Sequence, residues 1–451
     1  MTHDALRSAP EHEVADPRLF SKKVLAWGMW DWGSAAFNAV VTTFVFSVYL
    51  TSSPEFGGEA TVSAQLAWWM SGAGLVIALL APVTGQRSDR SGRRKFWLGV
   101  NTYIVVAITA ALVFIAPDPN LLWVGLFLIA AGNIFFEFAS VNYNAMLSQV
   151  STPRTIGKIS GFGWGLGYIG GIVLLLFLYF GLINPEVGLF GVTSEGGWNV
   201  RISMLIAALW LGLSALPVLL SVPENRQEDG PGAKIGLIGS YRKLGRDIAE
   251  LWRNDRQLAR FLLASAVFRD GLAGVFTFGG VLAAGTFGFS PGEVIIFAVA
   301  ANLVAGVSTI ALGALDDRVG AKPVILISLI GLVVCGLAVF FFHADGQTMF
   351  WIFGLGLCLF VGPAQSASRT FLSRSIPAGK EGELFGLYAT TGRAVSFLSP
   401  AAFGLAVTLG GAQYFGILGI VVIVLLGLAL MLPVRQNTPL ERTALMVDTD
   451  A

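Results

Sequence analysis

Five ionisable side chains lie inside long apolar stretches of this 451-residue chain: Asp31, Glu137, Arg269, Asp270 and Arg393. If such a stretch crosses a bilayer, a charge near its middle costs roughly 2.5–3.5 kcal/mol on insertion scales, so each one is a candidate for function. A carboxylate there can bind an ammonium group or carry a proton. A guanidinium there can bind a carboxylate through two parallel hydrogen bonds.

Each of these charges also has a structural alternative. Asp31 could pair with Arg393 and pin two helices together. Glu137 could neutralise an arginine instead of meeting a solute or a proton; it lies seven residues before Asn144, so the two share one helix face. Arg269 and Asp270 are adjacent and point about 100° apart on a helix, so both cannot face one cavity. We expect Asp270 to face the cavity and Arg269 to pair with another helix.

Aromatic residues accompany these charges. Trp164 and Tyr168 are four residues apart and lie on one helix face, and Tyr388 ends the stretch FGLY at 385–388. They could line an apolar, aromatic cavity. The alternative is that they anchor helices at the membrane interface, where Trp and Tyr are enriched.

The elements that carry these residues are predicted to be membrane-spanning helices. Fifty-five per cent of the residues are hydrophobic and 13% are charged, whereas roughly a quarter of the residues in soluble proteins are charged. The apolar stretches are continuous, which excludes a strand pattern of alternating residues, and each can cross a bilayer of about 30 Å. We expect an all-α protein with twelve spans, near 24–50, 63–85, 96–116, 120–143, 158–183, 201–222, 257–285, 291–313, 323–343, 347–371, 384–409 and 412–434.

The basic residues predict the orientation of these spans. Of the 29 Lys and Arg, 24 fall in alternate loops and in the two tails, and the intervening loops have none. Basic loops stay in the cytoplasm, so we expect both termini there, in a bacterial plasma membrane. Arg369 lies near the cytoplasmic end of its span and is interpreted as a gating or topology residue.

The chain repeats itself after half its length. The segment GQRSDRSGRRK at 85–95 follows the second span, and GALDDRVGAKP at 313–323 follows the eighth. This predicts two six-helix halves, 24–222 and 257–434, joined by a cytoplasmic linker at 223–256. Tails occupy 1–23 and 435–451. The linker ends in YRKLGRDIAELW, which is typical of a helix lying on the membrane surface, although a solvated linker is the alternative.

Both repeated loops resemble the motif between helices 2 and 3 of the major facilitator superfamily. The matching positions are Gly85, Asp89, Arg90, Gly92 and Arg93 in the first loop, and Gly313, Asp317, Arg318 and Gly320 in the second. The glycines allow a sharp turn, and Asp89 can sit at a helix N-terminus and pair with Arg, which suits a latch between conformational states. The alternative is that the basic residues only set topology.

Longer stretches resemble one branch of this superfamily, which contains the fungal vacuolar amino-acid effluxer linked to autophagy and its bacterial relatives. They are WGMWDWGSAAFNAVV from 27, FFEFASVNYNAMLSQ from 135, and GPAQSASR through FGLY between 362 and 388. The resemblance implies a twelve-helix carrier that exports amino acids such as leucine and tyrosine. The first stretch departs from the family's Tyr-Asp-Trp-Ala-Asn-Ser-Ala: Asp31 is kept, but Ser34 stands where the family has Asn.

These observations favour a secondary transporter of a small organic solute, an amino acid or related zwitterion, working as a monomer by alternating access and coupled to protons. An exporter of lipophilic cations is the alternative within transport, and a non-transporting sensor or scaffold is the alternative outside it. The two cysteines and three histidines form no metal pattern, and no phosphate-binding loop follows a strand. We therefore expect no cofactor, metal, nucleic-acid partner or enzymatic activity.

Overall fold

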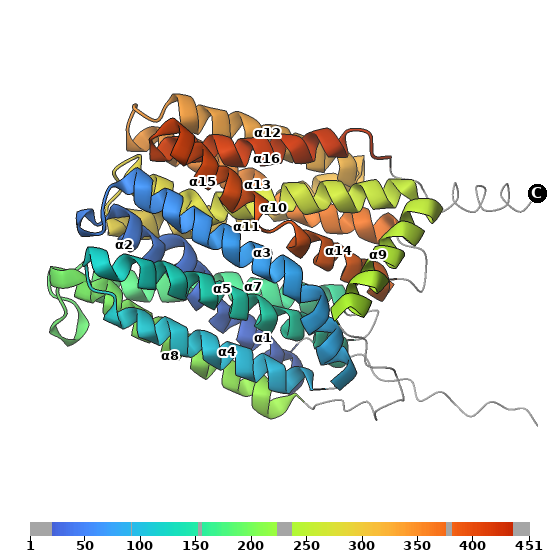
Figure 1. Cartoon of the computed structure of the whole chain (residues 1–451), viewed down its shortest axis with the longest axis horizontal. Helices are drawn as coiled ribbons and strands as arrows, with labels where there is room; N and C mark the ends of the chain where they lie inside the picture. The colour runs from blue at the N-terminus through green and yellow to red at the C-terminus, as the bar shows by residue number, and fades with distance from the viewer. Residues whose placement is uncertain (1–19, 92, 152–155, 223–236, 376–380, 436–451) are drawn as a thin grey trace, which may run out of the picture.

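The computed structural model describes residues 20–91, 93–151, 156–222, 237–375 and 381–435. Within these ranges it has no strand, and twelve helical segments are long and apolar enough to cross a membrane. The prediction of an all-α protein with twelve spans is confirmed. Figure 1 shows the helices running side by side, with the first six spans (blue to green) beside the last six (yellow to red).

The N-terminal half contains six spans. Its helices are α1 (Lys22–Ala35), η1 (Ala36–Phe44), α2 (Phe46–Ser52), α3 (Glu59–Ser91), α4 (Arg94–Ala111), α5 (Leu122–Ala145), α6 (Leu147–Val150), α7 (Ile156–Leu178), η5 (Tyr179–Ile183) and α8 (Trp198–Ser221). The C-terminal half contains α10 (Arg256–Gly285), α11 (Pro291–Val319), α12 (Ala321–Phe341), α13 (Gln347–Ser375), α14 (Glu381–Ala394), α15 (Leu398–Gly410) and α16 (Gly416–Met431).

A further helix, α9 (Leu237–Asn254), lies between the halves in sequence and contacts both α3 and α10. It crosses one end of the bundle, which we call the α9 end; the opposite end is the far end (Figure 1). The predicted linker helix therefore exists, and Ile248 and Trp252 on it are exposed.

Two spans are irregular. The first changes from α-helix to a nine-residue π-helix, η1, where the hydroxyls of Thr42 and Thr43 both donate to the Asn38 carbonyl at 2.7 and 2.8 Å. The eleventh is broken between α14 and α15. Pro400 explains the break, because it has no N–H to donate and its ring would clash with the carbonyl four residues earlier.

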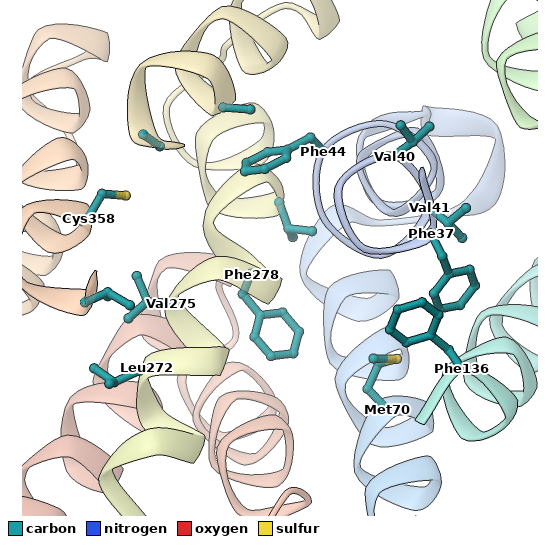
Figure 2. Packing of buried hydrophobic residues seen from close by; sticks show 14 of the residues in the cluster. Phe37, Val40, Val41, Phe44, Met70, Phe136, Leu272, Val275, Phe278 and Cys358 are labelled. Carbon is teal, nitrogen blue, oxygen red and sulfur yellow. The ribbon is translucent and has the colours of Figure 1, made fainter. Parts of the chain in front are cut away.

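The halves pack closely at the far end. Figure 2 shows Phe37 beside Phe136 within the N-terminal half, and Phe44 beside the helix that carries Phe278 in the C-terminal half. A Cβ atom at Gly280 of α10 would meet the Thr43 carbonyl oxygen and the Phe44 side chain. The absence of a side chain at Gly280 therefore lets α10 and η1 approach each other.

The neighbouring Gly279 provides a matched test of this approach, because nothing lies within 4 Å of a Cβ at that position. We expect Gly280→Ala to destabilise the protein by about 1–3 kcal/mol through overpacking, and Gly279→Ala to change the free energy of unfolding by no more than about 0.5 kcal/mol. Thermal unfolding of the purified protein in detergent measures both. Equal effects at the two positions would show that this contact does not hold the halves together.

Candidate functional site

An ion pair between the two halves is the centre of the site. Arg393 Nε lies 3.1 Å from Glu137 Oε2, and both side chains are partly accessible, at 20% and 31%. Glu137 belongs to α5, and Arg393 lies in the last turn of α14, where a cation is favoured by the helix dipole. The structure thus gives Arg393 a different acid partner, Glu137, from the suggested Asp31.

Asp31 has a partner within its own half. The Tyr143 hydroxyl donates to Asp31 Oδ2 at 3.0 Å. Trp27 and Trp30 stack on the Tyr143 ring with centroids 4.4 and 4.3 Å away. The Trp27 indole N–H also donates to the Tyr143 carbonyl at 3.2 Å, and that of Trp30 to Thr102 Oγ1 at 3.0 Å. This aromatic packing fixes the direction of the Tyr143 hydroxyl.

The sequence did not point to Trp27, Trp30 or Tyr143 as part of the site. The spacing carries a signal for Trp27, because it lies four residues before Asp31 and shares its helix face. No comparable signal ties Tyr143 to Asp31, since the two are 112 residues apart. The α7 glycines make room for this group: a Cβ at Gly163 would meet both the Trp27 ring and Asp31 Oδ2.

A second contact between halves involves Trp164 of α7 and Arg369 of α13. The Arg369 guanidinium carbon lies 4.7 Å from the centroid of the Trp164 ring, and Trp164 is 43% exposed. Tyr168 lies on the same face, with its ring centroid 6.2 Å from that of Trp164. The structure therefore brings a predicted gating residue onto the predicted aromatic face, and this face already receives a cation.

The side chains of Arg269 and Asp270 both contact the eleventh span, which consists of α14 and α15. Asp270 is buried, and its Oδ2 accepts a hydrogen bond from the Ser399 backbone N–H at 2.6 Å. Arg269 donates to the Tyr388 carbonyl at 3.2 Å and its guanidinium stacks over the Tyr388 ring at 3.8 Å. The Tyr388 hydroxyl lies 2.8 Å from Ser368 Oγ. Asp270 and Tyr388 are thus engaged within the C-terminal half.

Asn144 and the loop residues complete the sequence-predicted set. Asn144 is exposed, and its amide donates to Ser140 Oγ at 3.3 Å on the same helix. Arg93 and Arg318 are exposed, and Gly320 has a φ of +90°, which favours glycine at the turn between α11 and α12. Gly92 and the side-chain surroundings of the remaining loop positions lie outside the described structure: Gly85, Asp89, Arg90, Gly313 and Asp317.

A neighbour of the second loop motif forms an ion pair that the motif did not predict. Asp316 of α11 is buried, and its Oδ1 lies 2.7 Å from Arg374 Nη1 of α13. The contact joins the α9 ends of two helices within the C-terminal half. It places a carboxylate–arginine contact one position before Asp317, the residue that matches the motif.

A cavity of about 230 Å³ lies at the far end, between α2, the start of α8 and the start of α11. Its lining includes Tyr49, Glu55 and Asn199 from the N-terminal half, and Pro291 and Ile295 from the C-terminal half.

Twelve spans in two six-helix halves, which meet through charged and aromatic side chains, define a membrane transporter of the major facilitator superfamily. The chain belongs to the family described as vacuole effluxer Atg22 like, which matches residues 55–441.

Individual relatives agree with this assignment. The chain is 26% identical over 423 residues to YxiO of Bacillus subtilis, an uncharacterised MFS-type transporter, covering 93% of this chain and 96% of YxiO. It is 25% identical to autophagy-related protein 22 of Cryptococcus neoformans, covering 67% of this chain but 53% of the fungal protein. The fold is similar to the crystal structure of a D-xylose–proton symporter, with a TM-score of 0.66, 16% identity, and coverage of 92% and 97%.

The ion pair can be tested without knowledge of the substrate. Neutralising one partner leaves the other charge inside the protein without its counter-charge, so Glu137→Gln and Arg393→Gln should each lower the free energy of unfolding. The double variant should lower it by less than the sum of the two single effects. For a partly accessible pair we expect a coupling free energy of about 1–3 kcal/mol in a double-mutant cycle of thermal unfolding. Strictly additive effects of the two substitutions would contradict the pairing.

Proposed function

We propose that this transporter moves a small zwitterion, an amino acid or a close relative, by alternating access. The observation that carries the proposal is the Glu137–Arg393 pair, in which an acid and a base from opposite halves face each other at 3.1 Å and remain partly accessible. A zwitterion offers the two complementary charges, an ammonium for Glu137 and a carboxylate for Arg393.

A bound zwitterion could replace the Glu137–Arg393 pair with its own ion pairs to the two residues, and this exchange explains how a ligand acts on the halves. An empty site keeps its charges compensated by joining Glu137 to Arg393. A bound zwitterion compensates both charges separately, so the direct link between α5 and α14 is no longer needed. A ligand shifts a conformational equilibrium only if it binds one state more tightly, and this exchange of partners provides that difference.

Aromatic side chains of the N-terminal half suit an apolar substrate side chain. Trp164 and Tyr168 present an accessible face on α7, and the Trp27–Tyr143–Trp30 stack borders Asp31. The family resemblance, which implies transport of leucine and tyrosine by the fungal relative, supports the same substrate class.

Proton coupling is assigned to Asp31 in this proposal. Asp31 is partly accessible, and its Oδ2 accepts a hydrogen bond from the Tyr143 hydroxyl. Because a hydroxyl can both donate and accept, Tyr143 can accompany Asp31 through protonation without losing its hydrogen bond. Glu137 already forms an ion pair with Arg393, and Asp270 already accepts a hydrogen bond from the Ser399 N–H.

The membrane is proposed to be the plasma membrane of a bacterium, with the α9 end in the cytoplasm. Exposed arginines gather at that end, among them Arg242, Arg246 and Arg253 on α9. Arginine-rich loops are retained on the cytoplasmic side during insertion. The protein is proposed to act as a monomer, since each half contributes its own partner to the central pair.

An exporter of lipophilic cations is the second candidate function. The Trp164 ring already carries a guanidinium, that of Arg369, so this aromatic face is able to bind a cation. A planar organic cation could compete with Arg369 for the same face.

Counterflow in proteoliposomes tests the substrate class. We expect exchange of labelled leucine or tyrosine, and Arg393→Gln should raise the KM for the amino acid about 10- to 100-fold, the loss expected for a hydrogen bond to a charged group. The same substitution should affect the corresponding amino-acid amide much less, because the amide has no carboxylate. Arg253→Gln, an exposed arginine on α9, serves as the control. Exchange of a lipophilic cation but of no amino acid would favour the second candidate.

Gradient-driven accumulation tests the proton site. Asp31→Asn cannot take up and release a proton, so it should abolish accumulation of substrate against its gradient while exchange continues. Tyr143→Phe keeps the carboxyl group and should still accumulate substrate. Accumulation by Asp31→Asn at the wild-type level would show that coupling does not reside at Asp31.

A further inference from the structure

The break in the eleventh span lies directly beside the central ion pair. α14 ends at Ala394 and α15 begins at Leu398. Between them, the Ser396 N–H donates to the Arg393 carbonyl at 3.2 Å and the Leu398 N–H to the Val395 carbonyl at 2.9 Å. Arg393 is thus one residue before the end of α14. The direction of its side chain depends on how the two helix segments are set against each other.

Two adjacent residues of α10 hold the two segments. Arg269 binds α14 through the Tyr388 carbonyl and ring. Asp270 binds α15 through the Ser399 N–H at 2.6 Å. Ser399 is the second residue of α15, where backbone N–H groups have no partner within the helix. Asp270 therefore caps α15, and a carboxylate at this position is also favoured by the helix dipole.

The opposite half packs against the break itself. Ser71 Oγ of α3 donates to the Phe397 carbonyl at 3.2 Å, and Ser396 Oγ donates to the Gly74 carbonyl at 3.4 Å. A Cβ at Gly74 would meet the Ser396 carbonyl oxygen and the backbone of Phe397. The break is accordingly fixed from α10 on one side and from α3 on the other.

We propose that Asp270 is a positioning residue for the central pair: by capping α15 it sets the break at 395–397 and so directs Arg393 toward Glu137. The substrate-binding role of the pair rests on the proposed function, whereas the positioning of Arg393 by Asp270 does not. It gives Asp270 a different role from the cavity or proton-carrying role that the sequence suggested. Asp270 is buried, and its hydrogen-bonding partner is a backbone N–H of α15.

Cross-linking measures the position of residue 393 without any substrate. In a background with Cys335 and Cys358 replaced by Ala, Glu137→Cys and Arg393→Cys are treated with a bifunctional thiol reagent. We expect Asp270→Ala to slow this cross-link roughly 10-fold, the size of effect that follows loss of a helix cap. Asp270→Asn should leave it unchanged, because the amide oxygen still accepts from Ser399.

A second pair between the halves provides the matched control. Gln413 Nε2 donates to Ser63 Oγ at 2.8 Å at the far end of the molecule. The cross-link between Ser63→Cys and Gln413→Cys should form at the same rate with Asp270 and with Asp270→Ala. Should Asp270→Ala fail to reach the membrane, Ser399→Pro removes the N–H donor instead, within the first turn of α15 where no intrahelical hydrogen bond is lost, and should slow only the 137–393 cross-link.

Two results would overturn the proposal. Equal cross-linking of the 137–393 pair in Asp270 and Asp270→Ala proteins would show that the cap does not position Arg393. Equal slowing of both pairs would show that Asp270 only supports the fold as a whole. If the cross-links behave as expected but no amino acid is exchanged, the positioning role stands and the proposed substrate is wrong.

Discussion

Charges inside a membrane protein must be compensated by other protein groups, and the Glu137–Arg393 pair is where this constraint ties the two halves together. Each partner would be costly without the other, because the surroundings solvate a bare charge poorly. The pair joins α5 to α14 at 3.1 Å across the two halves. The neighbouring contacts serve the same need: Arg369 lies on Trp164, and Arg269 lies on Tyr388.

The two ends of the molecule are held together by different forces. At the far end, Gly280 lets α10 meet the backbone of η1, and apolar side chains such as Phe44 fill the contact. Toward the α9 end, the halves meet through an ion pair and a cation over an aromatic ring. Close packing of apolar surfaces changes little when a solute binds, whereas charged partners can be exchanged for those of a ligand. This difference is what the proposed alternating access requires.

The aromatic stack around Asp31 gives the N-terminal half a rigid inner wall. Phe37 stacks on Phe136, Phe136 on Trp30, and Trp30 on Tyr143, with centroid distances of 5.2, 5.7 and 4.3 Å. The stack runs from the apolar core to the Asp31 carboxylate. A polar group carried on such a wall has its position fixed by packing, which leaves few of its own degrees of freedom to be ordered.

The sequence by itself determined the all-α fold, the twelve spans and which charges lie within the spans. These features depend on local hydrophobicity and on individual residue types, which are visible in a short window of sequence. It did not determine which charges meet. Glu137 and Arg393 are 256 residues apart, and Asp31 and Tyr143 are 112 apart, so their pairing depends on the rotation and tilt of whole helices. The partner of Asp270 is a backbone N–H that became free only because the eleventh span breaks before Pro400. Tertiary structure alone decided that Asp270 caps a helix while Glu137 faces the opposite half, because desolvation demands a partner for each charge but does not specify which one.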